Sequence, residues 1–266
     1  MNVKRMAILT DVTRCIGCEE CVRACKGTNA TGKDKPWRWQ ESIDSLSAAR
    51  WTTIRARPPG RSVRQQCRHC LSPACVSACP VAALRKTAEG AVTYRSDICM
   101  GCRYCMMACP FQIPRYEWDS AVPRVRKCTL CHEHIFAGRL LEPACTKACP
   151  ADATKFGERD ALLSEARERI RANPKRYVDR IWGEHEYGGT SVMYVSDVDL
   201  GFLAWKDEPG GAALPDLTKP ALLSVPPVFL GVGAVLYGTW WVIERRMRLQ
   251  KEQPKEGAPP PEGGGA

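Results

Sequence analysis

Histidine is scarce in this sequence, and two familiar catalytic motifs are absent from it. Only 4 of the 266 residues are histidine, and His132-Glu133-His134 does not form the H-E-x-x-H motif of a metalloprotease. Gly231-Val-Gly233 lies inside an apolar run without the surrounding βαβ pattern of a dinucleotide-binding fingerprint. There is also no convincing pairing of a nucleophile with a base. We therefore expect a chain that is not catalytic by itself.

An export signal is also missing at the N-terminus. The stretch MNVKRMAILTDVTRC has neither an apolar h-region nor paired arginines. We expect no export signal on this chain itself.

The formal net charge is +10, but the basic residues are scattered between prolines and cysteines. Net charge of this size favours acidic partners in general. The scatter predicts a solvated or partner-facing basic surface, and no nucleic acid as a partner. The residues concerned are Arg55, Arg57, Arg61, Arg64, Arg68, Arg124, Arg126 and Lys127.

Cysteine is abundant, and its 16 residues form four groups of four with none left over. The first and third groups follow C-x2-C-x2-C-x3-C, and the second follows C-x2-C-x4-C-x3-C. The fourth keeps the C-x2-C start and the C-x3-C end around an inserted loop. Proline follows each of the last three groups, whereas Lys26 follows the first. The groups are Cys15, Cys18, Cys21 and Cys25; Cys67, Cys70, Cys75 and Cys79; Cys99, Cys102, Cys105 and Cys109; and Cys128, Cys131, Cys145 and Cys149.

Three chemistries compete for these thiols. Disulfides suit small secreted scaffolds, and C-x2-C neighbours are poorly placed to pair with each other. Structural zinc typically uses two C-x2-C pairs far apart in sequence, often with histidine. The spacing C-x2-C-x2-C-x3-C-P is that of bacterial ferredoxins, in which three thiolates bind one cubic cluster and the fourth binds the other. Four such motifs predict iron–sulfur clusters.

The same three-plus-one rule, with the pseudo-symmetry of the groups, predicts which cysteines share a cluster. The four expected sets are Cys67, Cys70, Cys75 with Cys109; Cys99, Cys102, Cys105 with Cys79; Cys15, Cys18, Cys21 with Cys149; and Cys128, Cys131, Cys145 with Cys25.

Residues between the cysteines are expected to close around the clusters. Gly17 and Gly101 let the backbone approach and direct amides at sulfur. His132 and His134 are expected to be loop residues near the fourth group, and not ligands. An apolar shell that limits water access is expected from Ile16, Met100, Met106, Met107 and Ile113.

The predicted fold class is α+β, with two pseudo-symmetric bacterial-ferredoxin-like modules, each with two [4Fe-4S] clusters, and one C-terminal transmembrane helix. Residues 1–157 are the tandem domain with four clusters, in which an inner module at 67–109 is inserted between 8–26 and 125–152. A hairpin around Glu89-Gly90 joins the second and third cysteine groups.

Two further segments lie outside the cysteine groups. Residues 26–66 contain Trp37, Trp39 and Trp51, which are expected to pack in the core, over a cluster or against a partner. Residues 158–219 are expected to form a helix and loop extension for partner contacts. Its helix, at 159–172, is predicted from one apolar face and from the Asn173-Pro174 stop. That face consists of Leu162, Leu163, Ala166 and Ile170.

Residues 220–243 carry no charge and are long enough to cross a bilayer once, although a buried core helix is the alternative. Tyr237, Trp240 and Trp241 fall near the end of the run, where an interfacial aromatic belt belongs. The basic stretch that follows predicts a single-pass protein of the cytoplasmic membrane, with the cluster domain periplasmic and the C-terminus cytoplasmic. Residues 244–266 are expected to be a basic and then disordered tail.

Several segments together resemble a known family: DVTRCIGCEECVRAC, CRHCLSPACVSACP, CMGCRYCMMACPFQIPRY, KCTLC with EPACTKACP, and GGTSVMYV. They are similar to the four-cluster iron–sulfur subunits of membrane-bound respiratory oxidoreductases, of the formate dehydrogenase beta and HybA types. The likeness extends from about residue 8 to 243. Lys26, in the place of proline, is a departure from the motif.

The resemblance implies an electron-transfer subunit with four [4Fe-4S] clusters. It implies a catalytic large subunit, of formate dehydrogenase or hydrogenase type, on one side and an integral-membrane cytochrome b or NrfD-like subunit on the other. Export as a prefolded complex on a partner's twin-arginine signal would reconcile cytoplasmic cluster assembly with a periplasmic domain. A soluble polyferredoxin carrier and a zinc-structured module that binds nucleic acid or protein are the alternative functions.

Overall fold

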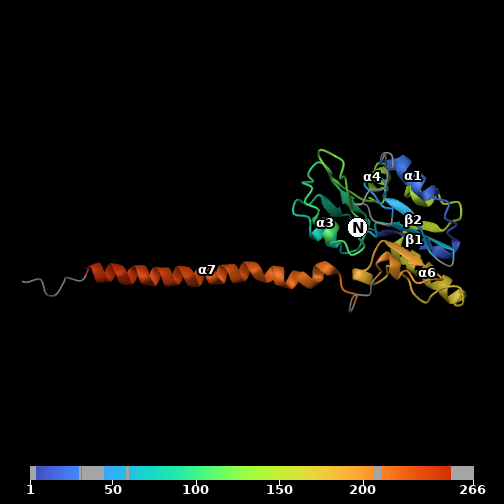
Figure 1. The fold of residues 1–266 in the computed structure, drawn as a ribbon. Helices are drawn as coiled ribbons and strands as arrows, with labels where there is room; N and C mark the ends of the chain where they lie inside the picture. The colour runs from blue at the N-terminus through green and yellow to red at the C-terminus, as the bar shows by residue number, and fades with distance from the viewer. Residues whose placement is uncertain (1–3, 30, 32–44, 58–59, 206–210, 253–266) are drawn as a thin grey trace, which may run out of the picture. The chain divides into compact units, whose positions relative to one another are not determined.

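The computed structural model describes residues 4–29, 31, 45–57, 60–205 and 211–252. Short helices and strands alternate along the chain (Figure 1), which confirms the predicted mixture of helix and strand. The chain divides into two compact units, Met1–Leu217 and Thr218–Ala266. Trp37 and Trp39 lie outside the described residues.

Most secondary-structure elements of the first unit are short, and the longest is the helix Arg159–Ala172, with 14 residues. The strands are β1 (Met6–Asp11), β2 (Thr52–Arg57), β3 (Arg61–Gln66), β4 (Leu84–Lys86), β5 (Val92–Tyr94), β6 (Arg115–Tyr116), β7 (Val125–Arg126), β8 (Thr154–Glu158) and β9 (Val192–Val195). The helices are α1 (Glu20–Asn29), α2 (Ala74–Ser77), α3 (Tyr104–Met107), α4 (His132–Phe136), α5 (Ala144–Lys147) and α6 (Arg159–Ala172).

A three-stranded sheet brings the two ends of this unit together, in the order β8-β1-β9. Strand β1 pairs antiparallel with β8, with Met6 opposite Glu158. It pairs parallel with β9, with Ile8 opposite Val192. The expected helix and loop extension at 158–219 therefore also supplies a strand to the core, which the sequence analysis did not predict.

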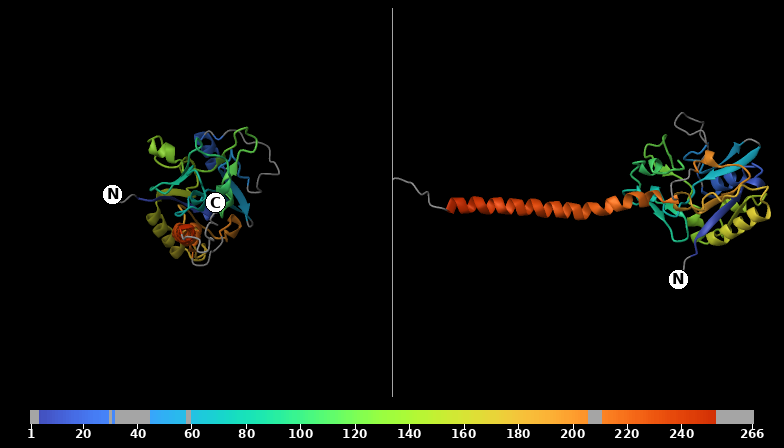
Figure 2. Two further views of the ribbon diagram at one scale, coloured as in Figure 1. Left: turned by 90° about the vertical axis from the view of Figure 1, so that its left-hand side faces the viewer. Right: turned by 90° about the horizontal axis from the view of Figure 1, so that it is seen from below.

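The two faces of this sheet pack against different parts of the unit, because successive side chains of a strand point to opposite faces. Helix α6 covers one face (Figure 1 and Figure 2). The buried residues between them are Ala7, Leu9, Leu162, Leu163, Ala166, Ile170, Ile181, Met193 and Val195. On the other face, Ile8, Val192 and Tyr194 join a larger core that contains Cys21 and other cysteines. The sheet thus forms one wall of the cysteine-bearing core.

Helix α6 confirms the prediction for residues 159–172. Its predicted apolar residues are all buried, and Asn173 is the C-cap before Pro174. Each buried leucine contributes about 1.5–3 kcal/mol by leaving water. At its first residue, the Arg159 Nε donates to the Thr190 carbonyl at 2.9 Å, which ties the helix to the segment before β9.

Three two-stranded hairpins surround the cysteines: β2-β3, β4-β5 and β6-β7. The β4-β5 hairpin confirms the prediction around Glu89-Gly90. Gly90 has a φ of +108°, and a Cβ there would lie 2.6 Å from the Met6 carbonyl oxygen. Trp51, beside β2, packs against the core, and its Nε1 donates to the Ala48 carbonyl at 2.8 Å.

The third cysteine of each group lies in a helix. Cys21 lies in α1, Cys75 in α2, Cys105 in α3 and Cys145 in α5. The last three of these helices have only one turn, and each is followed by one alanine, the next cysteine and a proline. Proline cannot continue the helical hydrogen-bond pattern, so the chain turns away after the fourth thiol.

The second unit contains most of one long helix, α7 (Leu214–Glu252). It has an 18-residue window with a mean hydropathy of 1.8 and is long and apolar enough to cross a membrane. The helix begins before the predicted span and continues beyond it into the basic stretch, although Pro220, Pro226 and Pro227 lie inside it. The remainder of the expected disordered tail, 253–266, lies outside the described residues.

Candidate functional site: sixteen thiols around a chain of hollows

All sixteen cysteines are free thiols. This excludes the disulfide alternative for the folded chain. Seven of them are buried and nine are partly exposed. The described residues contain no group of three or more His, Cys, Asp or Glu side chains placed to hold a single metal ion.

Thiols from opposite ends of the first unit meet at one hollow. Cys15, Cys18 and Cys21 line it together with Cys149 and with the side chain of Arg64. These are the three cysteines of one expected set and the distant fourth member. Burial raises the pKa of the Cys21 thiol to about 11 despite the opposing effect of Arg64. Strand pairing of β1 with β8 brings the distant cysteine here, because Cys149 precedes β8 by a short turn.

A second hollow is likewise lined by three cysteines of one group and one cysteine of another. Cys99, Cys102 and Cys105 line it together with Cys79, which belongs to the preceding cysteine group in sequence. Burial and the neighbouring thiols, first Cys79, raise the pKa of Cys105 to about 11.

The other eight cysteines neighbour one another in two further groups. Burial raises the pKa of Cys70 well above its usual value, and the thiols of Cys109, Cys67 and Cys75 raise it further.

In the remaining group, burial raises the pKa of Cys25 to about 12, with contributions from Cys145 and Cys131. Burial also raises the pKa of Cys128 well above its usual value, and its strongest thiol neighbour is Cys25. The thiols that neighbour one another are thus members of the same predicted set, and that each set binds one cluster stays a prediction.

Thiols of different sets also affect one another's pKa. Cys105 acts on the pKa of Cys75, after the larger effect of burial and of closer groups. In the same way, Cys67 acts on Cys128.

At the far end, Cys145 acts on Cys21, again after the larger effect of burial. Taken in turn, these effects place the four sets in an order. In that order they contain Cys79, Cys99, Cys102 and Cys105; Cys67, Cys70, Cys75 and Cys109; Cys25, Cys128, Cys131 and Cys145; and Cys15, Cys18, Cys21 and Cys149.

Backbone amides surround the sulfur atoms. The Ala83 amide donates to Cys79 Sγ at 3.2 Å, and the Ala153 amide donates to Cys149 Sγ at 3.3 Å. The Leu130 amide donates to Cys128 Sγ at 3.3 Å. Such donors favour the ionised form of a thiol, which is the form that binds metal.

Cys99 is the one cysteine with a shift in the opposite direction among those whose pKa clearly departs from its usual value. Burial raises the pKa of the Cys99 thiol. The Tyr94 hydroxyl and the backbone amides of Gly101 and Val125 lower this pKa, and together they outweigh the effect of burial. Its net pKa therefore lies below the usual value.

The two glycines expected to admit the backbone both have left-handed φ angles. Gly17 has a φ of +72°, and a Cβ there would lie 2.5 Å from Ser62 Oγ. Gly101 has a φ of +74°, and a Cβ would lie 3.0 Å from the Tyr116 hydroxyl oxygen. Both positions therefore need glycine, because other residues adopt this conformation at a cost.

The first hollow also contains buried polar atoms without a hydrogen-bond partner in the described part of the chain. Thr10 Oγ1, Thr154 Oγ1 and all three guanidinium nitrogens of Arg64 belong to this class, and all three residues line the hollow. Buried polar groups are nearly always hydrogen-bonded in native proteins. Four thiols, amide donors and unpartnered hydroxyl and guanidinium groups suit a sulfur-rich anionic cluster, so the residues fit a [4Fe-4S] group.

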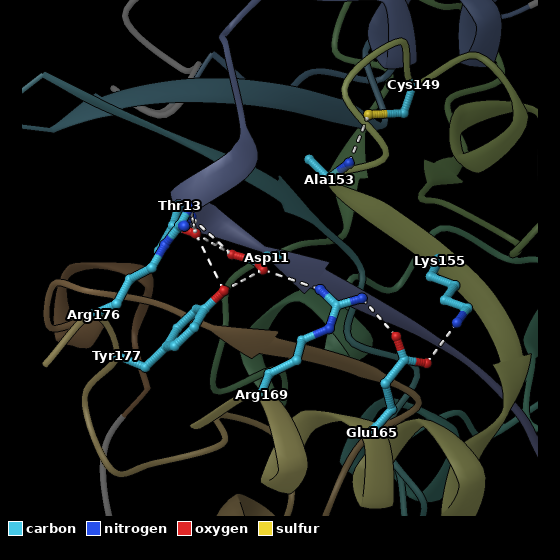
Figure 3. Close-up of polar contacts among 9 residues, drawn as sticks. All are labelled: Asp11, Thr13, Cys149, Ala153, Lys155, Glu165, Arg169, Arg176 and Tyr177. Carbon is cyan, nitrogen blue, oxygen red and sulfur yellow. Dashed lines mark hydrogen bonds and ion pairs between the residues drawn. The ribbon is translucent and has the colours of Figure 1, made fainter. Parts of the chain in front are cut away.

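A polar network fixes the sheet end from which the first cysteines emerge (Figure 3). Arg169 Nη1 donates to Asp11 Oδ2 at 3.0 Å, and the Tyr177 hydroxyl donates to the same oxygen at 2.8 Å. Arg169 Nη2 and Lys155 Nζ each donate to Glu165 at 2.6 Å. Burial opposes ionisation of Glu165, but these two cations outweigh it and lower the pKa of that carboxyl.

The expected basic surface is wrong for three of its residues. Arg64 and Arg68 are each 1% exposed, and Lys127 is 2% exposed. Lys127 Nζ donates to the Cys128 carbonyl at 2.9 Å, and the Arg68 guanidinium lies 4.7 Å from the centre of the Trp205 ring. A count of charges along the sequence gave no signal for this burial. The pattern of β3 gives no signal either, because Val63, Arg64, Gln65 and Gln66 are all buried and do not alternate.

The expected apolar shell is wrong in part. Ile113 is buried, but Ile16, Met100 and Met107 are 68%, 66% and 87% exposed. Ile16 and Met100 nevertheless line the hollows of Cys15 and of Cys99, whereas Met107 is the last residue of helix α3.

The expectation that His132 and His134 are loop residues is also wrong. They belong to helix α4, which follows Cys131. The His132 ring stacks on Phe136 at 5.8 Å, and its Nε2 lies 3.6 Å from Glu89 Oε2.

Comparisons with known proteins agree with this site. Residues 61–159 match a family described as a 4Fe-4S dicluster domain. A protein of Nitratidesulfovibrio vulgaris is 39% identical over 262 residues, which cover 94% of this chain and 70% of that protein.

Two further relatives have functional names. The hydrogenase-2 operon protein HybA of Escherichia coli O157:H7 is 33% identical, over 73% of this chain and 70% of its own length. The formate dehydrogenase-O iron-sulfur subunit of Escherichia coli K12 is 36% identical, over 72% of this chain and 67% of its own. The chain belongs to the family of HybA-type and formate dehydrogenase-type iron–sulfur subunits, which carry [4Fe-4S] clusters and transfer electrons.

Proposed function

We propose that this subunit holds four [4Fe-4S] clusters on its sixteen cysteines, in two ferredoxin-like modules, and relays electrons through them. The observation that carries the proposal is the convergence of distant thiols, since Cys149 lines the hollow of Cys15, Cys18 and Cys21, and Cys79 lines that of Cys99, Cys102 and Cys105. Electron transfer along several clusters also requires that each set lie next to another. Cys105 with Cys75, Cys67 with Cys128, and Cys145 with Cys21 are neighbours of this kind.

Bound [4Fe-4S] clusters supply one-electron chemistry, with potentials that depend on charge, hydrogen bonds to sulfur and solvent exposure. The chain supplies the thiolates, the amide donors and the exclusion of water. Because burial raises the pKa of most of these thiols, they are protonated in the metal-free chain at neutral pH. Ligation therefore requires the release of their protons.

The proposed partners lie at the two ends of the relay. Relatives are named as subunits of formate dehydrogenase and as a protein of a hydrogenase operon, which supports a catalytic large subunit as one partner. Helix α7 supports a membrane anchor beside an integral-membrane cytochrome b or NrfD-like subunit. The subunit itself is proposed to be non-catalytic.

The proposed cofactor is tested on the full-length chain purified in detergent without oxygen. We expect iron and acid-labile sulfide in equal amounts, equivalent to four cubic clusters per chain, and EPR signals that appear on reduction. Zinc in place of iron, or iron without sulfide, would refute the proposal. A chain that stays in solution without detergent would favour a diffusing polyferredoxin.

The proposed orientation places the cluster unit in the periplasm and the end of α7 in the cytoplasm. The basic residues Arg245, Arg246 and Arg248 near the end of α7 support it through the positive-inside rule. External protease added to spheroplasts should digest the cluster unit. Protection of that unit in intact spheroplasts, with digestion only after lysis, would overturn the orientation and leave the cofactor proposal unaffected.

A further inference from the structure

Arg64, on strand β3, is the buried charged residue with the most side-chain atoms that lack a hydrogen-bond partner in the described part of the chain. Its side chain is 1% exposed, and none of its three guanidinium nitrogens has a hydrogen-bond partner there. Burial of a charge without a compensating partner is strongly unfavourable. The position therefore calls for an anionic group that the polypeptide itself does not supply.

Other buried cations of this chain are satisfied differently. Lys127 Nζ donates to the backbone carbonyl of Cys128, and Arg159 Nε to that of Thr190. Arg68 donates to the Tyr194 hydroxyl and lies over aromatic rings. The guanidinium group of Arg64 has no such hydrogen bond among the described residues, and thiols are its strongest charged neighbours.

The surroundings of Arg64 belong to two thiol sets. Burial lowers the pKa of Arg64, but the thiols of Cys145 and Cys21, the Tyr194 hydroxyl and the thiol of Cys128 raise it, and the net shift is upward. The groups with the largest effects on Arg64 thus include no carboxylate. Arg64 lines the hollow of the final set, and the two thiols with the largest effects on it, Cys145 and Cys21, belong to the last two sets of the series.

We propose that Arg64 is a buried counter-ion shared by two clusters, and that its charge raises their reduction potentials relative to a chain without it. The clusters are those on Cys25, Cys128, Cys131 and Cys145 and on Cys15, Cys18, Cys21 and Cys149. This inference rests on the proposed function.

The physical basis is electrostatic. Reduction adds one electron, and therefore one negative charge, to a cluster. A fixed cation in a medium of low dielectric constant attracts the reduced form more strongly than the oxidised form. Arg64 thereby makes this end of the relay a more favourable place for an electron, and it acts through the cluster environment without being a ligand.

The test compares variants of the full-length chain that has been shown to contain iron and sulfide. Arg64→Met and Arg64→Gln remove the charge, and Arg64→Lys retains it. Arg61→Met is the matched control, because Arg61 lies on the same strand and pairs with Asp197 instead of a thiol. The readout is a redox titration followed by EPR, with iron analysis of each preparation.

We expect Arg64→Met and Arg64→Gln to move the one-electron reduction equilibrium of two clusters by at least about tenfold toward the oxidised form, or about 59 mV. The other two clusters and the Arg61→Met protein should stay close to the wild type. Arg64→Lys should keep the potentials of both clusters close to those of the wild type. Unchanged potentials in the neutral variants, an equal shift of all four clusters, or a lysine variant that behaves like the neutral ones would overturn the inference.

Loss of assembly is also informative. If the neutral variants lose the iron of two clusters while Arg64→Lys keeps it, a positive charge at this place is required, and the inference stands. If Arg64→Lys loses the same iron, the shape and not the charge of Arg64 matters, and the inference fails. Wild-type protein without iron and sulfide would instead refute the proposed function.

Discussion

Arg169 on α6 donates to the buried carboxylate of Asp11 at 3.0 Å, four residues before the first cysteine of the chain. Asp11 is 1% exposed and is the last residue of β1. The interaction connects helix α6 to the end of β1, from which the segment that carries Cys15 emerges. A structural helix thereby helps to position a candidate ligand.

The first prediction concerns this ion pair. Arg169→Ala leaves the Asp11 carboxylate buried with only Tyr177 and Thr13 as donors, so we expect a loss of about 1–3 kcal/mol in the free energy of unfolding. The loop with Cys15 should loosen as well, and the cluster set that includes it should hold iron less firmly. Thermal unfolding and the rate of iron loss to a chelator measure the two effects.

Arg171→Ala is the control for Arg169→Ala. Arg171 lies in the last turn of the same helix and is exposed. Its removal should leave both measurements within error of the wild type. Equal destabilisation by the two variants would mean that helix propensity or net charge, and not the contact with Asp11, is responsible.

The second prediction concerns Gly17, between the first two cysteines. Alanine at this position has to adopt a left-handed φ and brings a Cβ within 2.5 Å of Ser62 Oγ. We expect Gly17→Ala to cost about 1–3 kcal/mol of stability and to lower the iron content by up to one cluster. Iron and sulfide analysis, with thermal unfolding, tests this expectation.

Gly27→Ala is the matched variant for the glycine. Gly27 lies in α1, has ordinary helical backbone angles, and a Cβ there would have nothing within 4 Å. Because alanine favours the helix over glycine by up to about 1 kcal/mol, this variant should be neutral or slightly more stable. A similar loss in both variants would argue against a special backbone requirement at Gly17.

The third prediction tests which cysteines share a cluster. Cys15→Ser and Cys149→Ser should perturb the same EPR signal, and the double variant should lose no more iron than either single variant. Cys15→Ser combined with Cys25→Ser should perturb two signals and lose more. If the second pair is the non-additive one, neighbours in sequence share a cluster, and the three-plus-one sets are wrong.

The fourth prediction concerns α7 as a membrane anchor. Leu230→Lys with Val235→Lys places two charges in the middle of the apolar run, each at a cost of about 2.5–3.5 kcal/mol in a bilayer. We expect the chain to move from the carbonate-washed membrane fraction to the supernatant. Leu249→Lys, in the basic stretch, should stay in the membrane, whereas identical behaviour of both variants would exclude anchoring by this helix.

Local features were predictable where one short segment is sufficient to produce them. Helix α6 follows from the spacing of Leu162, Ala166 and Ile170, and the β4-β5 hairpin follows from the Glu89-Gly90 turn. Helix α7 was predicted as a single span over 220–243, whereas the helix extends over Leu214–Glu252 and contains three prolines. A continuous helix accommodates them, and this is tolerated in a membrane.

Burial of single charges was beyond the sequence. Arg64 and Arg68 belong to the same stretch as the more exposed Arg61, and nothing in composition separates them. Whether a side chain is buried depends on what the rest of the chain places over it. Here β9 and the cysteine loops, which are distant in sequence, cover these two arginines.

The sequence by itself determined the number and spacing of the thiols, their division into four groups, and the uncharged run at the C-terminus, because these are properties of adjacent residues. Only the tertiary structure decided that β9 lies beside β1 and that a lone guanidinium group is enclosed among sulfurs. The physical reason is that contacts between distant segments depend on the packing of the whole sheet and core, and no local pattern encodes that packing.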